Sequence, residues 1–167
     1  MRISIGHTSS AYPSLVVMPS GSVTAANASA ISDGAAALVL MRESTARKMG
    51  CTPLARIVAH SVHAQAPEWF ATAPAGAIEK VLKKAAWEAK SVDLWEVNEA
   101  FAAVVLRWVQ ALDLDMEKVN VNGGAIAMGH PIGATGAMIL GTMVDELERA
   151  DKERALITLC IGAGMGT

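Results

Sequence analysis

The sequence has few aromatic residues, few cysteines and no excess of positive charge. Phe, Trp and Tyr together make up 4% of its 167 residues, while hydrophobic residues as a class make up 52%. The apolar residues are therefore mainly aliphatic, which favours a layered core of helices and sheet and argues against disorder. The 14 Lys and Arg residues and 16 Asp and Glu residues leave a net charge of −2. Without a basic stripe, the chain is not expected to bind nucleic acid.

The two cysteines, Cys51 and Cys160, lie far apart and form no CxxC pair. Free thiols in this arrangement are typical of a reducing compartment, so we expect a cytoplasmic protein. His60 and His63 have no acidic or cysteine ligand at a suitable spacing, and no metal site is expected.

Long hydrophobic runs are also scarce. The first 20 residues carry only a short apolar stretch, at 15–18, which is too short for a secretory signal. Residues 125–144 are long and apolar enough to span a membrane, but Pro131 and four glycines interrupt a helix there. We therefore expect no membrane segment, and a small membrane protein is the least favoured alternative.

From residue 21 onward, short apolar runs alternate with helical patterns, which is typical of an α/β layered fold. The apolar runs predict strands over 35–41, 54–60, 92–97 and 155–161, the first of them buried on both faces. The helical patterns lie over 43–50, 73–90, 99–112 and 136–150.

Four short stretches place polar or reactive groups at the ends of these apolar elements, where layered folds build their sites. They are AANAS at 25–29, VNEAF at 97–101, GHPIGATG at 129–136 and LCIGAGMG at 159–166.

His130 lies between Gly129 and Pro131, and Pro131 is expected to open the following helix. The positive end of that helix would favour a neutral imidazole. Such a ring can donate a hydrogen bond to an oxyanion or accept a proton from a thiol. The alternative is a structural histidine bonded to the backbone.

Cys160 precedes a glycine-rich turn whose N–H groups could point outward, as an oxyanion hole requires. Its thiol could act as an acid, a base or a nucleophile, or it could be a small buried hydrophobe. Asn98 follows a predicted strand, and capping of the next helix is the simpler interpretation when it is taken alone.

Taken together, the four stretches resemble the C-terminal half of the thiolase family, which includes acetyl-CoA acetyltransferases and 3-ketoacyl-CoA thiolases. The matching motifs are GSVTAANASAISDGAAALVLM, EVNEAFAAV, NVNGGAIAMGHPIGATGA and TLCIGAGMG, in family order over 21–166. The resemblance implies a layered α/β fold with one mixed five-stranded sheet and helices on both faces. It divides the chain into an irregular non-family segment at 1–20 and a thiolase C-terminal domain at 21–167. We expect that domain to lack its final strand.

The resemblance also implies a role for each motif residue. His130 would bind the thioester oxygen and help to activate the nucleophile, and Asn98 would hold a water that completes this oxyanion hole. Cys160 would be the acid/base at the α-carbon of acetyl-CoA, and the Gly162 N–H would contribute to a second oxyanion hole. Ser29 would contact the pantetheine of coenzyme A. The substrates would be acetyl-CoA and other acyl-CoA thioesters, in a ping-pong Claisen condensation or its reverse, with no permanently bound cofactor.

The chain departs from the family in one important respect. The cysteine that becomes acylated belongs to the family's N-terminal half, and neither Cys51 nor Cys160 lies in that motif. We therefore expect this chain to be inactive alone and to need a complementing N-terminal thiolase half. An apolar face made for that half would favour a homo-oligomer or self-association. The alternative is a non-catalytic remnant or a coenzyme A-binding interaction module.

One substitution within a motif concerns the backbone. Ala163 replaces a glycine that is usual in the family, which is a small change if the local backbone avoids positive φ.

Overall fold

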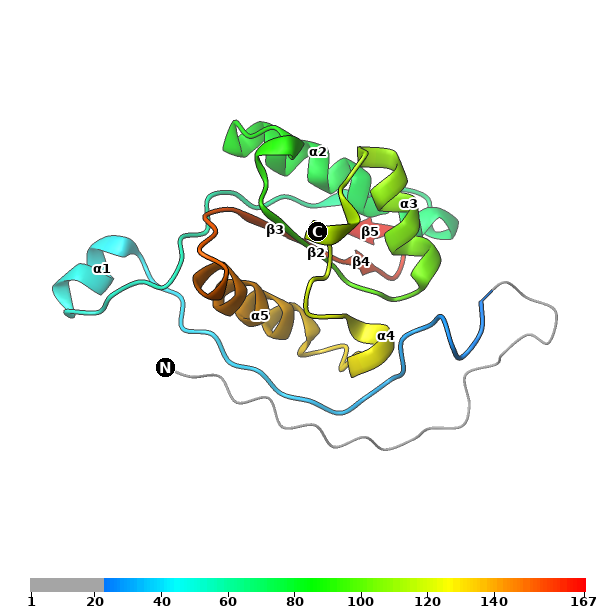
Figure 1. The fold of residues 1–167 in the computed structure, drawn as a ribbon, viewed down its shortest axis with the longest axis horizontal. Helices are drawn as coiled ribbons and strands as arrows, with labels where there is room; N and C mark the ends of the chain where they lie inside the picture. Colours follow the sequence, from blue (N-terminus) through cyan, green and yellow to red (C-terminus); the bar gives the residue numbers. More distant parts are fainter. Residues whose placement is uncertain (1–22) are drawn as a thin grey trace.

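The computed structural model describes residues 23–167 (Figure 1). The predicted segment 1–20 lies outside the described residues. The α-helices are α1 (Glu43–Lys48), α2 (Ala73–Ala85), α3 (Ala102–Leu112), α4 (Ala125–Met128) and α5 (Thr135–Arg149). The strands are β1 (His63–Ala64), β2 (Leu94–Val97), β3 (Ala155–Thr158), β4 (Cys160–Ile161) and β5 (Met165–Gly166). Short 3-10 helices cover Pro67–Thr72, Ala89–Ser91 and Met116–Lys118.

The α/β class is as the sequence predicts, but the five described strands form two sheets and not one. Strands β2 and β3 are parallel, and β1, β5 and β4 form an antiparallel sheet in that order. The division falls at Leu159, between β3 and β4. Strand β2 has ended at Val97, so Leu159 has no partner in that strand. Leu159 pairs instead with Thr167, through two backbone hydrogen bonds of 3.0 Å. A change of partner, from a parallel to an antiparallel neighbour, therefore separates the sheets.

Strand β2 is buried on both faces because helices cover both sides (Figure 1). Trp95 and Val97 contribute one face to the main hydrophobic cluster, together with residues of α2 and α3 such as Ile78 and Trp108. The alternating position, Glu96, lies on the opposite face and lines a cavity bordered by α4 and α5. The period-2 alternation of a strand thus separates Trp95 and Val97 on one face from Glu96 on the other.

The predicted helices are all present. In α2, Pro74 lies in the first turn and Ile78 faces the core, while Lys83 and Lys84 occupy the last turn. The prediction that α3 is buried around most of its circumference is wrong in part, because Leu106 is 58% exposed. Val104, Val105 and Trp108 are the buried residues of α3, and Val109 and Leu112 pack against the same cluster, as expected for a helix that packs on one side.

The predicted strands at 35–41 and 54–60 do not form. Both segments lie outside regular structure, and Val39, Leu40, Leu54 and Ile57 are each more than 60% exposed. An apolar run becomes a buried strand only where another strand accepts its backbone hydrogen bonds. Within residues 23–167, neither segment has such a partner.

Residues 125–144 are divided between α4 and α5, with Pro131 in the connection. In the described part of the chain, no helix has the length and apolar character needed to cross a membrane.

Ala163 lies at the tip of the β4–β5 hairpin with φ of 65°, beside Gly164 at 87°. The condition for a harmless Gly-to-Ala replacement is therefore not met, because a Cβ in the left-handed region is disfavoured by roughly 1–2 kcal/mol. The hairpin that follows Cys160 carries local strain.

We expect Ala163→Gly to raise the free energy of unfolding by about 1 kcal/mol, because glycine adopts positive φ without this cost. Urea denaturation of the two proteins measures the change. The matched control is Ala137→Gly inside α5, where glycine should lower stability by about 1 kcal/mol. Equal destabilisation by both substitutions would contradict the strain at Ala163.

Candidate active site

The loop between α4 and α5 carries His130, and its backbone is held in place from both sides. The His130 N–H donates to the Ala30 carbonyl at 2.8 Å, and His130 forms an isolated bridge with Ile31. Gly129 adopts φ of 91°, and a side chain there would collide with Ser32. The glycine before His130 is thus required by both conformation and space.

The hydrogen bonds of the His130 ring define its tautomer. Nδ1 lies 2.7 Å from the Thr135 hydroxyl oxygen, and that hydroxyl donates its single hydrogen to the Pro131 carbonyl at 2.9 Å. All of these contacts are satisfied when Nδ1 carries the proton and donates to Thr135, which leaves a lone pair on Nε2. The Asn98 Nδ2 group donates toward this Nε2 at 3.4 Å. Burial lowers the pKa of His130, so the neutral ring is favoured. The sequence predicted that the positive end of a helix would favour the neutral ring, but the physical cause of the lowered pKa is burial of the ring.

Asn98 follows β2 directly, and its backbone N–H donates to the Thr158 carbonyl of β3 at 3.0 Å. The side chain does not cap α3, whose N-cap residue is Phe101 without a side-chain hydrogen bond. The simpler capping interpretation is therefore wrong. Instead the 3%-exposed side chain turns toward His130, and its Oδ1 has no hydrogen-bond partner among residues 23–167.

Glu99 anchors the turn after β2 to α4. Its two carboxylate oxygens accept from the Asn120 side chain at 3.0 Å and from the Ile126 N–H at 3.1 Å. Gly124 leaves the space that the carboxylate occupies, since a Cβ there would overlap Glu99. These contacts hold the two loops of the site in one arrangement.

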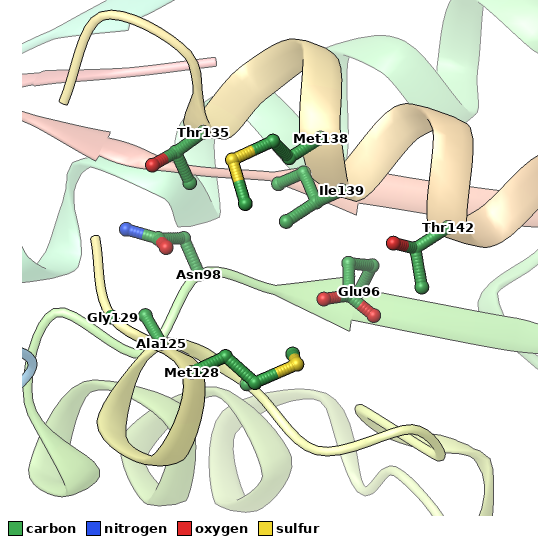
Figure 2. A pocket seen from close by; sticks show the side chains of 10 residues that line it. Glu96, Asn98, Ala125, Met128, Gly129, Thr135, Met138, Ile139 and Thr142 are labelled. Atoms are coloured by element: carbon green, nitrogen blue, oxygen red, sulfur yellow. The ribbon is translucent and has the colours of Figure 1, made fainter. Parts of the chain in front are cut away.

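A cavity of about 40 Å³ lies behind Asn98, between α4 and α5 (Figure 2). Its lining is mostly apolar, with Asn98, Thr135, Thr142 and Glu96 as the polar side chains. Glu96 is only 2% exposed, and burial, with a contribution from the Glu99 carboxylate, raises its pKa to about 8. The sequence analysis missed Glu96, although a single acidic residue inside the apolar run LWEV was the signal that could have found it.

Comparison with known proteins gives the family. The model described as "Thiolase, C-terminal domain" matches residues 51–167, and the one described as "Thiolase, N-terminal domain" matches residues 10–44. The chain belongs to the thiolase family. The second match includes residues 10–20, where the sequence analysis found no family pattern.

Individual thiolases match over most of this chain. An acetyl-CoA acetyltransferase of Thiocystis violacea is 51% identical and one of Escherichia coli (strain K12) is 52% identical, each over 146 residues. Each match covers 87% of this chain and 37% of the relative, so the chain spans little more than a third of their length.

Solved structures confirm the thiolase-type fold. The acetyl-CoA acetyltransferase of Bacillus anthracis has a TM-score of 0.85 at 51% identity, and a human mitochondrial 3-ketoacyl-CoA thiolase in complex with CoA has 0.85 at 47%. Both matches cover 87% of this chain and 37% of the other.

The structure joins some of the thiolase motif residues directly by hydrogen bonds. His130 and Asn98 are in hydrogen-bond contact. Ser29 lies beside them, with its N–H and its hydroxyl both donating to the Ala100 carbonyl, at 3.1 and 3.3 Å. Cys160 is half-buried in β4 against the hydrophobic cluster, and Gly162 lies in the hairpin with open space around it. Among the described residues, no hydrogen bond joins Cys160 to His130.

Burial raises the pKa of the Cys160 thiol, so its protonated form is favoured at neutral pH. A protonated thiol suits proton donation better than nucleophilic attack at rest. No group of three His, Cys, Asp or Glu side chains in the described part of the chain could hold a metal ion.

Replacing Thr135 by Val removes the acceptor of the Nδ1–H of the half-buried His130 ring. We expect Thr135→Val to lower the free energy of unfolding by about 1–3 kcal/mol, and Thr135→Ser to stay near wild type. Urea denaturation measures the stability, and nitrogen NMR of the His130 ring measures the tautomer. Thr142→Val, on the same helix and cavity wall, is the control and should leave the His130 tautomer unchanged. A wild-type tautomer in Thr135→Val would contradict the assignment.

The raised pKa of Glu96 predicts a pH dependence of stability. In the window from 4.5 to about 8, the unfolded chain has lost the Glu96 proton while the folded chain keeps it. Stability therefore falls as pH rises through this window, by at most about 1.4 kcal/mol per pH unit. Glu96→Gln lacks this proton, so we expect the variant to gain stability relative to wild type as pH rises. Urea denaturation at a series of pH values tests this, and a constant difference across the window would show that Glu96 titrates normally.

Proposed function

We propose that this chain is the C-terminal portion of a thiolase-type acyltransferase, which moves an acyl group between coenzyme A thioesters by Claisen condensation or thiolysis. The observation that carries the proposal is the His130–Asn98 pair, in which a half-buried neutral imidazole with its lone pair on Nε2 faces a primary amide. Family membership supplies the reaction class, and this pair supplies the chemistry within the chain.

In this proposal the His130 Nε2 accepts the proton of the nucleophilic cysteine thiol and later returns it to the leaving thiolate of coenzyme A. The Nδ1–H bond to Thr135 keeps Nε2 free for this transfer. While Nε2 carries the proton, its N–H and the Asn98 amide are two donors that converge on the thioester oxygen or on a water bound there. The lowered pKa of His130 favours return of the proton.

Cys160 acts as the second acid/base. Its protonated thiol gives a proton to the α-carbon during thiolysis, and the thiolate takes a proton from that carbon during condensation. The Gly162 N–H contributes to a second oxyanion hole for the thioester oxygen, and the open space on the Cβ side of Gly162 lets a substrate approach this part of the backbone. Ser29 contacts the pantetheine of coenzyme A, since its hydroxyl oxygen keeps lone pairs while its hydrogen goes to Ala100. The coenzyme A thioesters are substrates, and no further cofactor is needed.

The nucleophilic cysteine comes from a complementing N-terminal thiolase half. Two observations support this: the chain spans 37% of its relatives, and the segments 35–41 and 54–60 expose aliphatic side chains along an extended backbone. We propose that these segments form strands against the complementing half, and that the bare chain self-associates or forms homo-oligomers through the same surface. The proposed setting is cytoplasmic lipid metabolism. The competing proposal is a remnant that binds coenzyme A without turnover.

Coexpression with the N-terminal part of the E. coli relative tests the proposal. We expect the purified pair to cleave acetoacetyl-CoA in the presence of coenzyme A, and the chain alone to be inactive. His130→Ala should lower the rate about a hundredfold or more, because the general base and one oxyanion donor are lost together. A coupled spectrophotometric assay for acetyl-CoA formation measures the rate.

Lys152→Ala is the control, because Lys152 is exposed and lies outside the site and outside segments 35–41 and 54–60, and it should leave the rate unchanged. Equal rates in wild type and His130→Ala would overturn the assigned role. A stable pair that is stabilised against heat by millimolar acetyl-CoA, yet does not turn over, would favour the remnant.

A further inference from the structure

Two polar atoms lie buried on the same face of β2 without a hydrogen-bond partner in the described residues. They are the Glu96 Oε2 and the Asn98 Oδ1. Glu96 lies in β2, and Asn98, two positions later, is the first residue after the strand. Figure 2 shows both side chains projecting from β2 into the space between α4 and α5. Both residues line the same cavity.

The cavity between these side chains has room for a bridging water. Residues i and i+2 project from the same face of a strand with their Cα atoms about 6.6 Å apart, so Glu96 and Asn98 border the same space. The cavity volume of about 40 Å³ exceeds the volume of roughly 10–15 Å³ that one water needs. Most of the remaining lining is apolar, including Met128, Met138 and Ile139, and the Thr135 and Thr142 hydroxyls are the other polar side-chain groups in it.

Two acceptor oxygens need a donor between them, and a bridging water can supply one hydrogen to each. A carboxylate and an amide oxygen both only accept, whereas a protonated carboxyl group also donates one O–H. The burial of Glu96 and the nearby Glu99 carboxylate both favour the protonated form at neutral pH. The Glu96 O–H can then donate to the water, and the water to the Asn98 Oδ1.

We propose that Glu96 is a positioning residue that fixes the orientation of the Asn98 amide through a bridging water. With Oδ1 held on the cavity side, the NH2 group of Asn98 points to the His130 Nε2, as observed. Without Glu96 the amide is free to rotate and to place its oxygen against the Nε2 lone pair. The catalytic consequence rests on the proposed thiolase-type function, but the orientation of the amide does not.

Three variants separate this role from a general effect on packing. Glu96→Leu removes the donor and fills similar space, Glu96→Gln keeps an N–H donor that cannot ionise, and Met138→Leu changes an apolar wall of the same cavity. The 167-residue chain is labelled with nitrogen-15 at its asparagines, and NMR measures hydrogen exchange of the Asn98 side-chain amide. The Asn98 signal is assigned because it disappears in Asn98→Asp. We expect exchange to be about tenfold faster or more in Glu96→Leu, and within about twofold of wild type in the other two.

The complemented enzyme provides the second readout. Glu96→Leu should lower kcat about tenfold or more with KM within about twofold, and Glu96→Gln should recover most of the loss. A purely structural role would lower stability in both Glu96 variants and would not separate kcat from KM.

Wild-type exchange in Glu96→Leu, or a Glu96→Gln variant as impaired as Glu96→Leu, would overturn the positioning role. If Glu96→Leu does not fold, Glu96→Ala, which also removes the carboxyl group, takes its place, and wild-type exchange in Glu96→Ala would overturn the proposal. The infrared difference between wild type and Glu96→Gln should contain the band of a protonated carboxylic acid at neutral pH. An inactive wild-type pair would count against the proposed function, while the exchange result would still decide the role of Glu96.

Discussion

The parallel pairing of β2 with β3 is the constraint on which the rest of the site depends. The register aligns Leu94 with Ala155 and Val97 with Thr158, and one further hydrogen bond ties the Asn98 N–H to Thr158. Because parallel strands point the same way, the chain segments that follow both strands begin at the same edge of the sheet. Asn98 directly follows β2 at this edge. Cys160 lies two residues after Thr158, the last residue of β3. A shift of one residue in this register would turn Glu96 and Asn98 toward the opposite face.

The segment 28–31 acts as a brace between the two loops of the site. Ala28 bridges to Phe101 on one side, and Ile31 bridges to His130 on the other. The Ser29 contacts with Ala100 and the His130 contact with Ala30 add hydrogen bonds to this brace. Residues separated by about 70 to 100 positions in the sequence are thereby fixed within a few ångströms of each other.

Burial has one consistent electrostatic effect across the site. It lowers the pKa of His130, and it raises the pKa values of Glu96 and Cys160. All three shifts favour the uncharged form, because a low-dielectric environment penalises each charge. A site of neutral groups with defined donors and acceptors is suited to proton transfers in which charge appears only transiently.

Local sequence patterns determined the helices α2, α3 and α5 and the strands β2 and β3, because periodicity and capping residues act within a few positions of each other. The motifs also located His130 and Asn98, and family resemblance linked them to thioester chemistry. Only the tertiary structure decided that 35–41 and 54–60 are not strands, that the sheet divides at Leu159, and that Ala163 takes positive φ. It alone placed Glu96 in the cavity behind Asn98. Strand pairing, cavities and pKa shifts depend on partners far away in the chain, and no local pattern encodes them.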